Sequence, residues 1–497
     1  MTKGLREPKG AASAKEERSS RNGNPGVEPL GDEGPRGRGS SPAPRAKSYP
    51  VISSAIPPPS RAHNVLMVLM RADALRPPTS AAFCRLHRSG TCRSCPHQDT
   101  PLDLQLTRKQ QRVAQMLAAA PNPVPADAWL PPVASAPERF RNKAKMVVSG
   151  RAAAPVLGIL GPDGGIDLRS CPLHMSAIED ALPVLSRAVS RLGIGPYDVE
   201  GRHGELKHLL VTASPDGDLM VRWVLRSHRH VERLRDALPE LRRELPTLAV
   251  VSANIQPVHQ AVIEGEEEII LTDDVPWGDR LLMRLRLPGP VDGGSGPDGI
   301  SADRTGGAER AGKAGRATGN ELLLFLPTRS FFQTNTGVAE RLYATAAHWA
   351  QGLGRQAEVW DLFCGVGGFA LALAGSGRRV LGVEVSEPAI RGARESAALM
   401  GLSSRDVRFE SGDARILTPG AGAVPDLLVV NPPRRGIGAE LAGRIDNSGV
   451  GRMLYSSCNP VSLAADLEAM PSLRVRRARL FDMFPHTDHA EVLVELV

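Results

Sequence analysis

The chain has 497 residues, a formal net charge of +7 and six cysteines. That length is enough for two or three domains. Its apolar runs all fall short of the roughly 20 residues that a membrane span needs, which excludes a membrane-spanning protein, and we expect a cytoplasmic one. In a chain of this kind, six cysteines favour a metal site or catalysis over a disulfide framework.

The positive charge is unevenly distributed. Lys and Arg outnumber Asp and Glu in residues 1–82 and again in residues 83–170, whereas the rest of the chain is net acidic. A nucleic-acid partner would therefore contact the second of these regions through its phosphates. There, Arg141, Lys143 and Lys145 alternate along an extended segment and share one face. We interpret these cations as phosphate contacts, with an ordinary solvated edge strand as the alternative.

Composition divides the chain into four parts. Residues 1–82 are rich in Gly, Pro, Ser and Arg and predict a disordered basic extension. Residues 289–320 have the same character and predict a disordered insertion or linker. Residues 83–288 combine short apolar strands with helical stretches, which predicts an α+β domain. Residues 321–497 repeat strand, loop and helix and end in two successive strands, which predicts an α/β domain with a doubly wound sheet.

Four cysteines have the spacing of a metal centre. Cys84, Cys92 and Cys95 form a C-x7-C-x2-C run, and Cys171, followed by proline, lies far downstream. Four thiolates suit a tetrahedral zinc ion. Proline after a ligand cysteine is also found in iron–sulfur proteins, so spacing alone leaves both centres open.

A glycine turn follows the first strand of the α/β part. The turn, Gly365–Gly368, lets the backbone approach a ligand closely. Glu384, at the end of the second strand, is placed to bind ribose hydroxyls. Asp413 follows the third strand and would reach an adenine, and Asn431-Pro432-Pro433 ends the fourth. The Gly-x-Gly-Gly turn together with Asn-Pro-Pro favours S-adenosylmethionine over NAD.

Cys458 ends a short apolar strand, just before a helix that Asn459-Pro460 opens. This edge of an open α/β sheet binds ligands, and a helix N-terminus favours thiolate, although a buried inert cysteine is the competing interpretation. Thiolate addition at C6 of a pyrimidine makes C5 nucleophilic enough to accept a methyl group. A base must then remove the C5 proton. Glu491 is the candidate, with His486 and His489 as alternatives.

Taken together, these motifs resemble the RNA uracil-C5 methyltransferases, and among them the 23S ribosomal RNA enzymes of the RumB/RlmC type. The resemblance covers residues 83–288 and 321–497. Besides the four cysteines, it rests on Phe140-Arg-Asn-Lys-Ala-Lys145, Asn254-Ile-Gln-Pro257, Phe331-Phe-Gln333, Asp361-Leu-Phe-Cys-Gly-Val-Gly-Gly368, Asn431-Pro-Pro-Arg-Arg-Gly436, Ser456-Ser-Cys-Asn459 and Phe481-Asp-Met-Phe-Pro-His486.

The resemblance implies an N-terminal iron–sulfur and RNA-binding domain followed by a Rossmann-like, S-adenosylmethionine-dependent methyltransferase domain. It implies a [4Fe–4S] cluster on Cys84, Cys92, Cys95 and Cys171. It implies that S-adenosylmethionine is bound by Gln333, Phe363, Glu384 and Asn431, and the strand and turn pattern adds Gly365 and Asp413 to this set. It also implies Cys458 as nucleophile and Glu491 as base. The expected partner is a hairpin-loop uridine of 23S ribosomal RNA, because an unpaired base reaches the thiol most cheaply, and we expect a monomer.

Three other functions stay open on the sequence. Transfer RNA is the less favoured substrate, because no separate small β-barrel domain precedes the cysteines as in some relatives. An amino-group methyltransferase would use Asn431-Pro432-Pro433, but Arg434 replaces the aromatic residue that follows in such enzymes, and Cys458 would have no role. A non-catalytic RNA-binding protein with a structural metal centre would not bind S-adenosylmethionine.

Overall fold

The computed structural model describes residues 83–259, 262–289, 320–375, 377–414 and 424–497. All of them belong to the unit Arg76–Val497. The predicted extension, residues 1–82, and nearly all of the predicted insertion, residues 289–320, lie outside the described residues. Within the described ranges, no helix is both long and apolar enough to cross a membrane.

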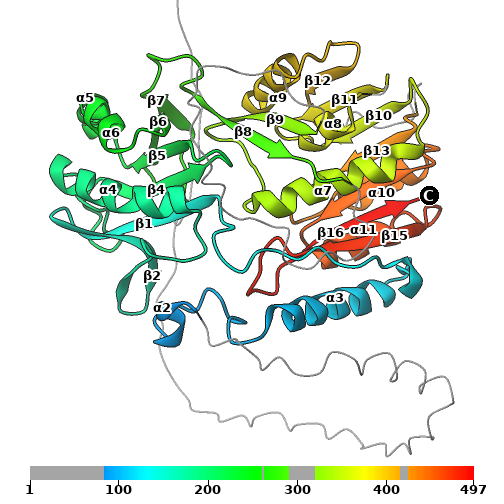
Figure 1. Cartoon of the computed structure of the whole chain (residues 1–497), viewed down its shortest axis with the longest axis horizontal. Helices are drawn as coiled ribbons and strands as arrows, with labels where there is room; N and C mark the ends of the chain where they lie inside the picture. The colour runs from blue at the N-terminus through cyan, green and yellow to red at the C-terminus, as the bar shows by residue number, and fades with distance from the viewer. Residues whose placement is uncertain (1–82, 260–261, 290–319, 376, 415–423) are drawn as a thin grey trace, which may run out of the picture. The chain divides into compact units, whose positions relative to one another are not determined.

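The C-terminal half forms a seven-stranded sheet in the order β12-β11-β10-β13-β14-β16-β15 (Figure 1). Strands β10 to β14 are parallel, and β16 pairs antiparallel with both β14 and β15. The strands are β10 (Glu358–Leu362), β11 (Arg379–Glu384), β12 (Val407–Ser411), β13 (Leu427–Val430), β14 (Met453–Ser457), β15 (Val475–Phe481) and β16 (Glu491–Leu496). The strand order reverses between β10 and β13, which makes the carboxyl ends of these strands the expected ligand site.

Helices cover both faces of this sheet, as a buried parallel sheet requires. One face carries α7 (Thr336–Trp349), α8 (Gly368–Leu373) and α9 (Glu387–Leu399). The other carries α10 (Ala439–Asp446), α11 (Pro460–Glu468) and, from far earlier in the chain, α3 (Leu102–Ala118). Alternation along β10 serves both layers, because Val359 packs into the first cluster and Leu362 into the second.

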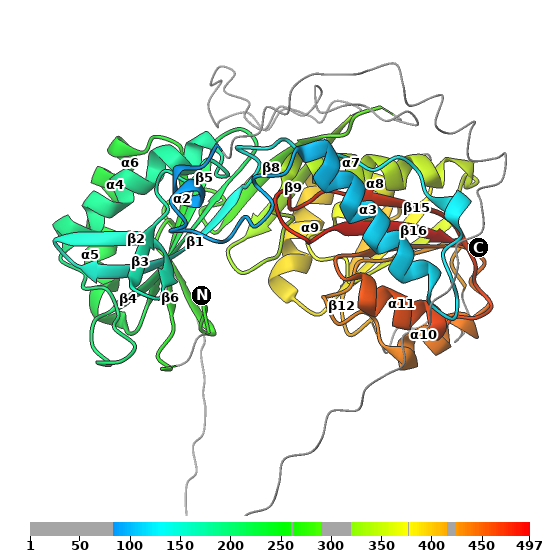
Figure 2. The same ribbon diagram turned by 90° about the horizontal axis from the view of Figure 1, so that it is seen from below.

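The chain from α3 onward runs beside the β15–β16 hairpin (Figures 1 and 2). Leu117 of α3 lies in the same apolar cluster as α11. Beyond the helix, the backbone N–H of Leu130 donates to the carbonyl of Ala478 at 2.8 Å. The N–H of Val133 likewise donates to Leu480 at 2.8 Å. This stretch therefore adds an extended segment to the β15 edge.

The N-terminal half forms a second seven-stranded sheet, in the order β3-β2-β1-β4-β5-β6-β7, in which only β5 and β6 pair in parallel. Its strands are β1 (Lys143–Arg151), β2 (Ala154–Gly161), β3 (Gly164–Asp167), β4 (Leu206–Ala213), β5 (Leu219–Leu225), β6 (Leu248–Ile255) and β7 (Glu267–Ile270). One face packs on α4 (Ser176–Leu192), α5 (Val231–Asp236) and α6 (Leu238–Glu244).

Smaller elements connect the two sheets. A two-stranded antiparallel ladder of β8 (Arg280–Arg286) and β9 (Glu321–Pro327) shares an apolar cluster with Met220 and Val250 of the N-terminal sheet. The remaining short helices are α2 (Arg85–Arg88), η1 (Ala126–Ala128), η2 (His228–His230) and η4 (Ala350–Gly352).

Buried charge fixes the far end of β16. The Glu495 side chain is fully buried, and the guanidinium groups of Arg452, Arg476 and Arg477 contact its carboxylate at 2.5 to 3.0 Å. Arg477 also lies over the ring of Trp349, 4.6 Å from its centroid. Neutralising the carboxylate would leave three cations together without their anion.

We therefore expect Glu495→Gln to lower the free energy of unfolding by about 3–5 kcal/mol, the cost of breaking a buried ion pair. Urea denaturation followed by tryptophan fluorescence would measure it. Glu440→Gln is the matched control, because it breaks an exposed pair with Arg444 and should cost less than about 1 kcal/mol. Equal losses in the two variants would contradict the assigned role of Glu495.

Candidate active site

One edge of the C-terminal sheet gathers most of the predicted site residues. Five of them end or follow the parallel strands β10 to β14, in chain order Phe363, Glu384, Asp413, Asn431 and Cys458. Because β16 runs antiparallel to these strands, its first residue, Glu491, begins at the same edge.

Strand register brings Cys458 and Glu491 together. In the β14–β16 ladder Ser457 pairs with Val492, so the next position places Cys458 opposite Glu491. Side chains that oppose each other across an antiparallel pair lie on the same face of the sheet, with Cβ atoms roughly 5 Å apart. The nucleophile and the base predicted from sequence are therefore cross-strand neighbours.

The Glu491 carboxyl group is fully buried, and burial raises its pKa to about 7. One neighbour opposes this shift. The hydroxyl of Ser456, also buried, donates a hydrogen bond to Glu491 Oε1 at 2.5 Å. A carboxyl group with a pKa near neutrality can accept a proton during a reaction and release it afterwards.

Cys458 has a raised pKa, caused first by burial and then by the Glu491 carboxylate. The expectation that the helix N-terminus leaves this thiol with a lowered pKa is thus not met. Arg434 opposes the rise through its charge and a hydrogen bond to the thiol. The Asn459 amide in turn donates to the Arg434 carbonyl at 2.9 Å.

A buried carboxylate holds the loop that carries Arg434. Asp466 accepts the backbone N–H groups of Ile437 and Gly438, at 2.9 and 3.0 Å, and the Tyr455 hydroxyl at 2.5 Å. Gly436 has a φ of +79°, and a Cβ there would come within 2.2 Å of Asp466 Oδ2, so only glycine fits. The sequence motif contains Arg434 but gives no sign that it lies beside the thiol.

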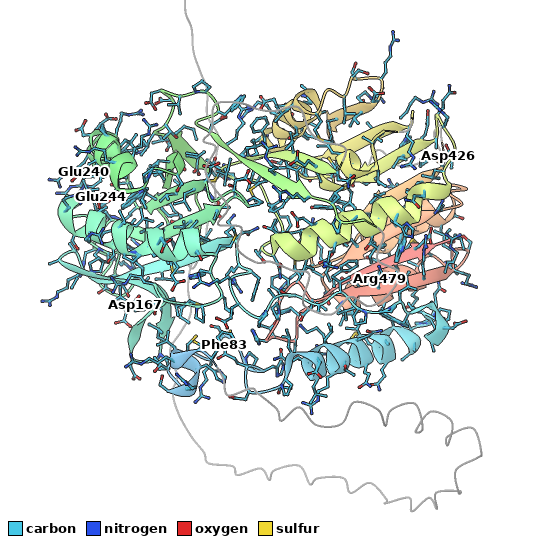
Figure 3. The ribbon with its side chains drawn as sticks, in the orientation of Figure 1. Phe83, Asp167, Glu240, Glu244, Asp426 and Arg479 are labelled. Carbon is cyan, nitrogen blue, oxygen red and sulfur yellow. The ribbon has the colours of Figure 1, made fainter. Side chains whose placement is uncertain are left out.

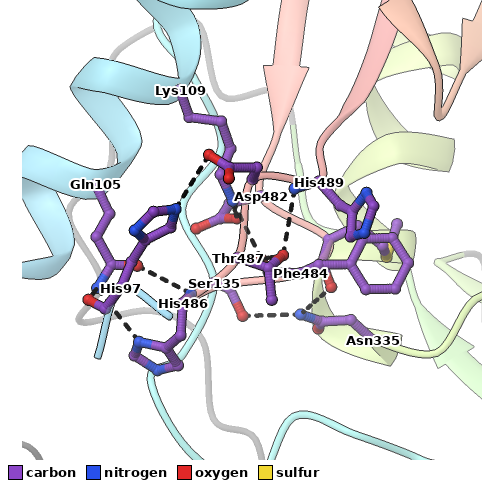
Figure 4. A network of polar contacts seen from close by, with 12 residues as sticks. His97, Gln105, Lys109, Ser135, Asn335, Asp482, Phe484, His486, Thr487 and His489 are labelled. Atoms are coloured by element: carbon purple, nitrogen blue, oxygen red, sulfur yellow. Dashed lines mark hydrogen bonds and ion pairs between the residues drawn. The ribbon is translucent and has the colours of Figure 1, made fainter. Parts of the chain in front are cut away.

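The two histidines considered as alternative bases differ in position. His486 is buried, and its ring nitrogens contact Gln105 and the Pro137 carbonyl. His489 is exposed, and its ring packs edge-on against Phe484 (Figure 4). Glu491 alone of the three directly opposes Cys458 in the β14–β16 register.

The glycine turn and Glu384 are joined by a hydrogen bond. Gly365 donates its N–H to Glu384 Oε2 at 3.2 Å, and Ser386 donates to Oε1 at 3.0 Å. Gly367 has a φ of +86°, and a Cβ there would lie 2.9 Å from the Phe409 ring. Phe363, immediately before the turn, also has a positive φ, 66°. A backbone held this tightly presents its N–H groups at a fixed position.

Asp361 is a site residue that the sequence motifs include without singling it out. It is fully buried at the end of β10 and accepts the Ala370 N–H at 2.9 Å, while its Oδ1 atom has no partner among the described residues. Burial raises its pKa to about 8. An acidic residue two positions before Phe363 was the signal that could have identified it.

The remaining predicted cofactor residues are less tightly connected to this edge. Gln333 lies between β9 and α7, is buried, and accepts a hydrogen bond from the Asn142 amide on its carbonyl at 2.9 Å. Asp413 and Asn431 are half-buried. Cys364, the second cysteine of this half, is buried in the turn, and burial raises the pKa of its thiol.

The other four cysteines come together near the start of the described chain. Burial, followed by the neighbouring thiols of Cys171, Cys92 and Cys84, raises the pKa of Cys95 to about 12. All four are free thiols, and the Leu173 N–H donates to the sulfur of Cys171. Sequence residues almost ninety positions apart therefore meet in one neighbourhood.

Whether these residues suit a metal centre depends on two observations that point in different directions. Among the residues described, no group of three or more His, Cys, Asp or Glu side chains is arranged to hold a metal ion. The thiols are nevertheless close enough for three of them to raise the pKa of Cys95. We give the second more weight, because a cationic centre would relieve this crowding of ionisable thiols, and the donor set fits one.

The three cations predicted to contact phosphate do alternate with buried residues along β1, but their exposure differs. Lys145 is exposed. Lys143 is largely buried, and burial lowers its pKa to about 8. Arg141 lies near the cysteines, since its charge lowers the pKa of both Cys95 and Cys171. Only Lys145 has the exposure that a phosphate contact needs.

Comparison with known proteins places this site in context. The family model described as tRNA (Uracil-5-)-methyltransferase matches residues 316–404 and 424–497. A protein named 23S rRNA (uracil(747)-C(5))-methyltransferase RlmC from Halothiobacillus neapolitanus is 46% identical over 420 residues, 83% of this chain and 99% of that protein. The protein of the same name from Serratia proteamaculans is 42% identical over 416 residues, again 83% and 99% of the two chains.

A solved structure shares the fold. The crystal structure of Pyrococcus abyssi tRNA (uracil-54, C5)-methyltransferase with S-adenosyl-L-homocysteine matches with a TM-score of 0.60 at 21% identity, over 81% of this chain and 85% of that chain. The fold is thus that of an S-adenosylmethionine-dependent methyltransferase. The identity to relatives along nearly their whole length adds the family: this chain belongs to the S-adenosylmethionine-dependent RNA uracil-C5 methyltransferases.

Proposed function

We propose that the enzyme methylates C5 of a uridine in 23S ribosomal RNA, at the position equivalent to uracil 747 in the names of its relatives. The observation that carries the proposal is the cross-strand pair of Cys458 and Glu491, at the edge where the glycine turn and Glu384 also lie. A thiol beside a buried carboxyl group suits C5 methylation, whereas methylation of an amino group needs no such thiol.

In the proposed mechanism, S-adenosylmethionine supplies the methyl group from its sulfonium. The Cys458 thiolate, which Arg434 helps to stabilise, bonds to C6 of the uracil. The C5=C6 electron pair becomes available at C5, which takes the methyl group. Glu491 then accepts the C5 proton, the C5=C6 double bond re-forms, and the Cys458 sulfur leaves as thiolate. Its raised pKa suits Glu491 to this proton transfer.

The proposed cofactor site consists of Gln333, Phe363, Gly365, Glu384, Asp413 and Asn431, to which the structure adds Asp361. Each Glu384 oxygen accepts one backbone N–H and keeps a lone pair for a ribose hydroxyl. The unpartnered oxygen of buried Asp361 suits a cationic group such as the methionine ammonium.

Residues 83–288 are proposed to bind RNA and to hold a [4Fe–4S] cluster on Cys84, Cys92, Cys95 and Cys171. Methyl transfer moves no net electrons, so the cluster would be structural. The target uridine must be unpaired or flipped to reach Cys458, which favours a hairpin loop. Exposed Lys145 supports a phosphate contact nearby. We further propose that the enzyme acts as a monomer in the cytoplasm.

Cys458→Ala should abolish methyl transfer but keep the affinity for cofactor and RNA. With a 23S hairpin-loop RNA carrying 5-fluorouridine, the wild type should form a covalent adduct that survives denaturing electrophoresis, because fluorine does not leave as a proton does. Cys364→Ala should still form this adduct.

Two results of that experiment would count against the proposal. Full activity of Cys458→Ala would exclude the covalent mechanism and favour an amino-group methyltransferase. Faster trapping on a transfer RNA arm than on the 23S hairpin would make transfer RNA the substrate.

The pH dependence follows from Glu491. The base acts only when ionised, and burial raises its pKa to about 7, so activity should be lost as pH falls through about 7 and recovered as pH rises. Single-turnover methylation between pH 5.5 and 8.5 would measure this. A flat profile over that range would argue against Glu491 as the base.

Purification without oxygen should give a brown protein containing iron and acid-labile sulfide. Cys171→Ala should lose both, because a four-cysteine site cannot keep its geometry with three thiolates. Arg169→Ala, two residues away with its side chain bound to Asp167, is the matched control and should keep the iron. Full occupancy by zinc alone would contradict the cluster.

A further inference from the structure

The catalytic base is preceded by a loop that is fixed from outside its own sheet. The loop, Asp482–Ala490, joins β15 to β16 and leads directly into Glu491. Lys109 of α3 is buried against it, with its ammonium 2.6 Å from Asp482 Oδ1 and 3.1 Å from the Phe484 carbonyl (Figure 4). The loop's position therefore depends on chain segments more than 370 residues away in sequence.

His486, at the centre of this loop, bonds only to the N-terminal segment in the contacts described. Its N–H donates to Gln105 Oε1 at 2.9 Å, and its carbonyl accepts from the His97 N–H at 3.1 Å. Ring Nε2 lies 2.8 Å from the Pro137 carbonyl, which can only accept, so this nitrogen carries the proton. Nδ1 then accepts from the Gln105 amide at 3.3 Å. Every polar group of the residue is thus used.

The backbone of His486 is held in an unusual conformation. Its φ is 65°, in the left-handed region that side chains other than glycine and asparagine rarely adopt. Strain of this kind persists only where the surroundings impose it, and it clusters at functional sites. The bonds to Gln105, His97 and Pro137 are the surroundings that impose it here.

The anchor on the other side is the cysteine-bearing segment. The ring of Phe83 packs edge-on against His486 at 5.4 Å, and Phe83 immediately precedes Cys84 (Figure 3). Gln98 ties the two ends of the segment together, donating its N–H to the Cys95 carbonyl and accepting the Cys84 N–H. His486 thus joins the cysteine-bearing segment to the loop before Glu491.

The geometry points to His486 as a positioning residue for Glu491, which fastens the base to the cysteine-bearing segment. This role rests on the proposed mechanism, in which Glu491 acts only after the thiol has added and the methyl group has been transferred. A displaced base would therefore leave the first steps intact and slow the last. The enzyme would then accumulate as a covalent, methylated adduct with ordinary uridine.

Two variants test the link from its opposite sides. His486→Gly keeps the left-handed backbone but removes the ring, and Gln105→Leu removes the partner on α3. With a uridine hairpin RNA and S-adenosylmethionine, both should turn over about 10- to 100-fold more slowly, as expected for a small misplacement of a catalytic group. Both should also show an adduct stable to denaturation, unchanged cofactor affinity, and faster amide hydrogen exchange in residues 482–490.

Matched variants give these results their meaning. Arg112→Ala cuts an exposed contact between the same helix and the same loop, at Asp488, and should behave as wild type. Glu491→Gln should accumulate the adduct. If it does so while His486→Gly and Gln105→Leu turn over normally, the positioning role is wrong and the mechanism stands.

Two other outcomes also count against the role. Loss of cofactor affinity together with adduct formation in both variants would indicate a general folding role for His486. Absence of adduct in Glu491→Gln would overturn the proposed mechanism and the positioning role with it.

Discussion

The antiparallel pairing of β14 with β16 is the constraint on which the rest of the site depends. Parallel strands alone would bring only cofactor residues to the carboxyl edge, since each is followed by a helix. A final strand inserted in the opposite direction starts at that edge and supplies Glu491 opposite Cys458. A shift of one residue would oppose Cys458 with Val492 or Ala490 and turn the glutamate to the other face.

Burial then sets the chemistry of the pair. The carboxyl group of Glu491 lies among apolar side chains, and its pKa rises toward neutrality, where proton transfer is most effective. The same burial disfavours the Cys458 thiolate, and Arg434 opposes that effect. The loop carrying Arg434 is held by Asp466, and the loop before Glu491 is held by His486. Nucleophile and base are thus each positioned by a loop with its own buried anchor.

The sequence predicts the doubly wound sheet and its terminal hairpin because apolar strands, glycine turns and helix caps are local signals. It predicts Cys458 and Glu384 for the same reason, since both end strands. It could not predict that Arg434 would contact the thiol, because that contact depends on how a loop folds back over a neighbouring strand. Burial is also a tertiary property, so the direction of the pKa shift at Cys458 was wrong and the exposure of Lys143 was overestimated.

Release of the C5 hydrogen tests the central claim most directly, because C5 methylation must remove it and amino-group methylation does not. Hairpin RNA labelled with tritium at uridine C5 would be incubated with the enzyme and S-adenosylmethionine. We expect one tritium released for each methyl group transferred by the wild type, and adduct formation without tritium release in Glu491→Gln. Methyl transfer without tritium release, or release by Glu491→Gln at the wild-type rate, would contradict the proposed roles of Cys458 and Glu491.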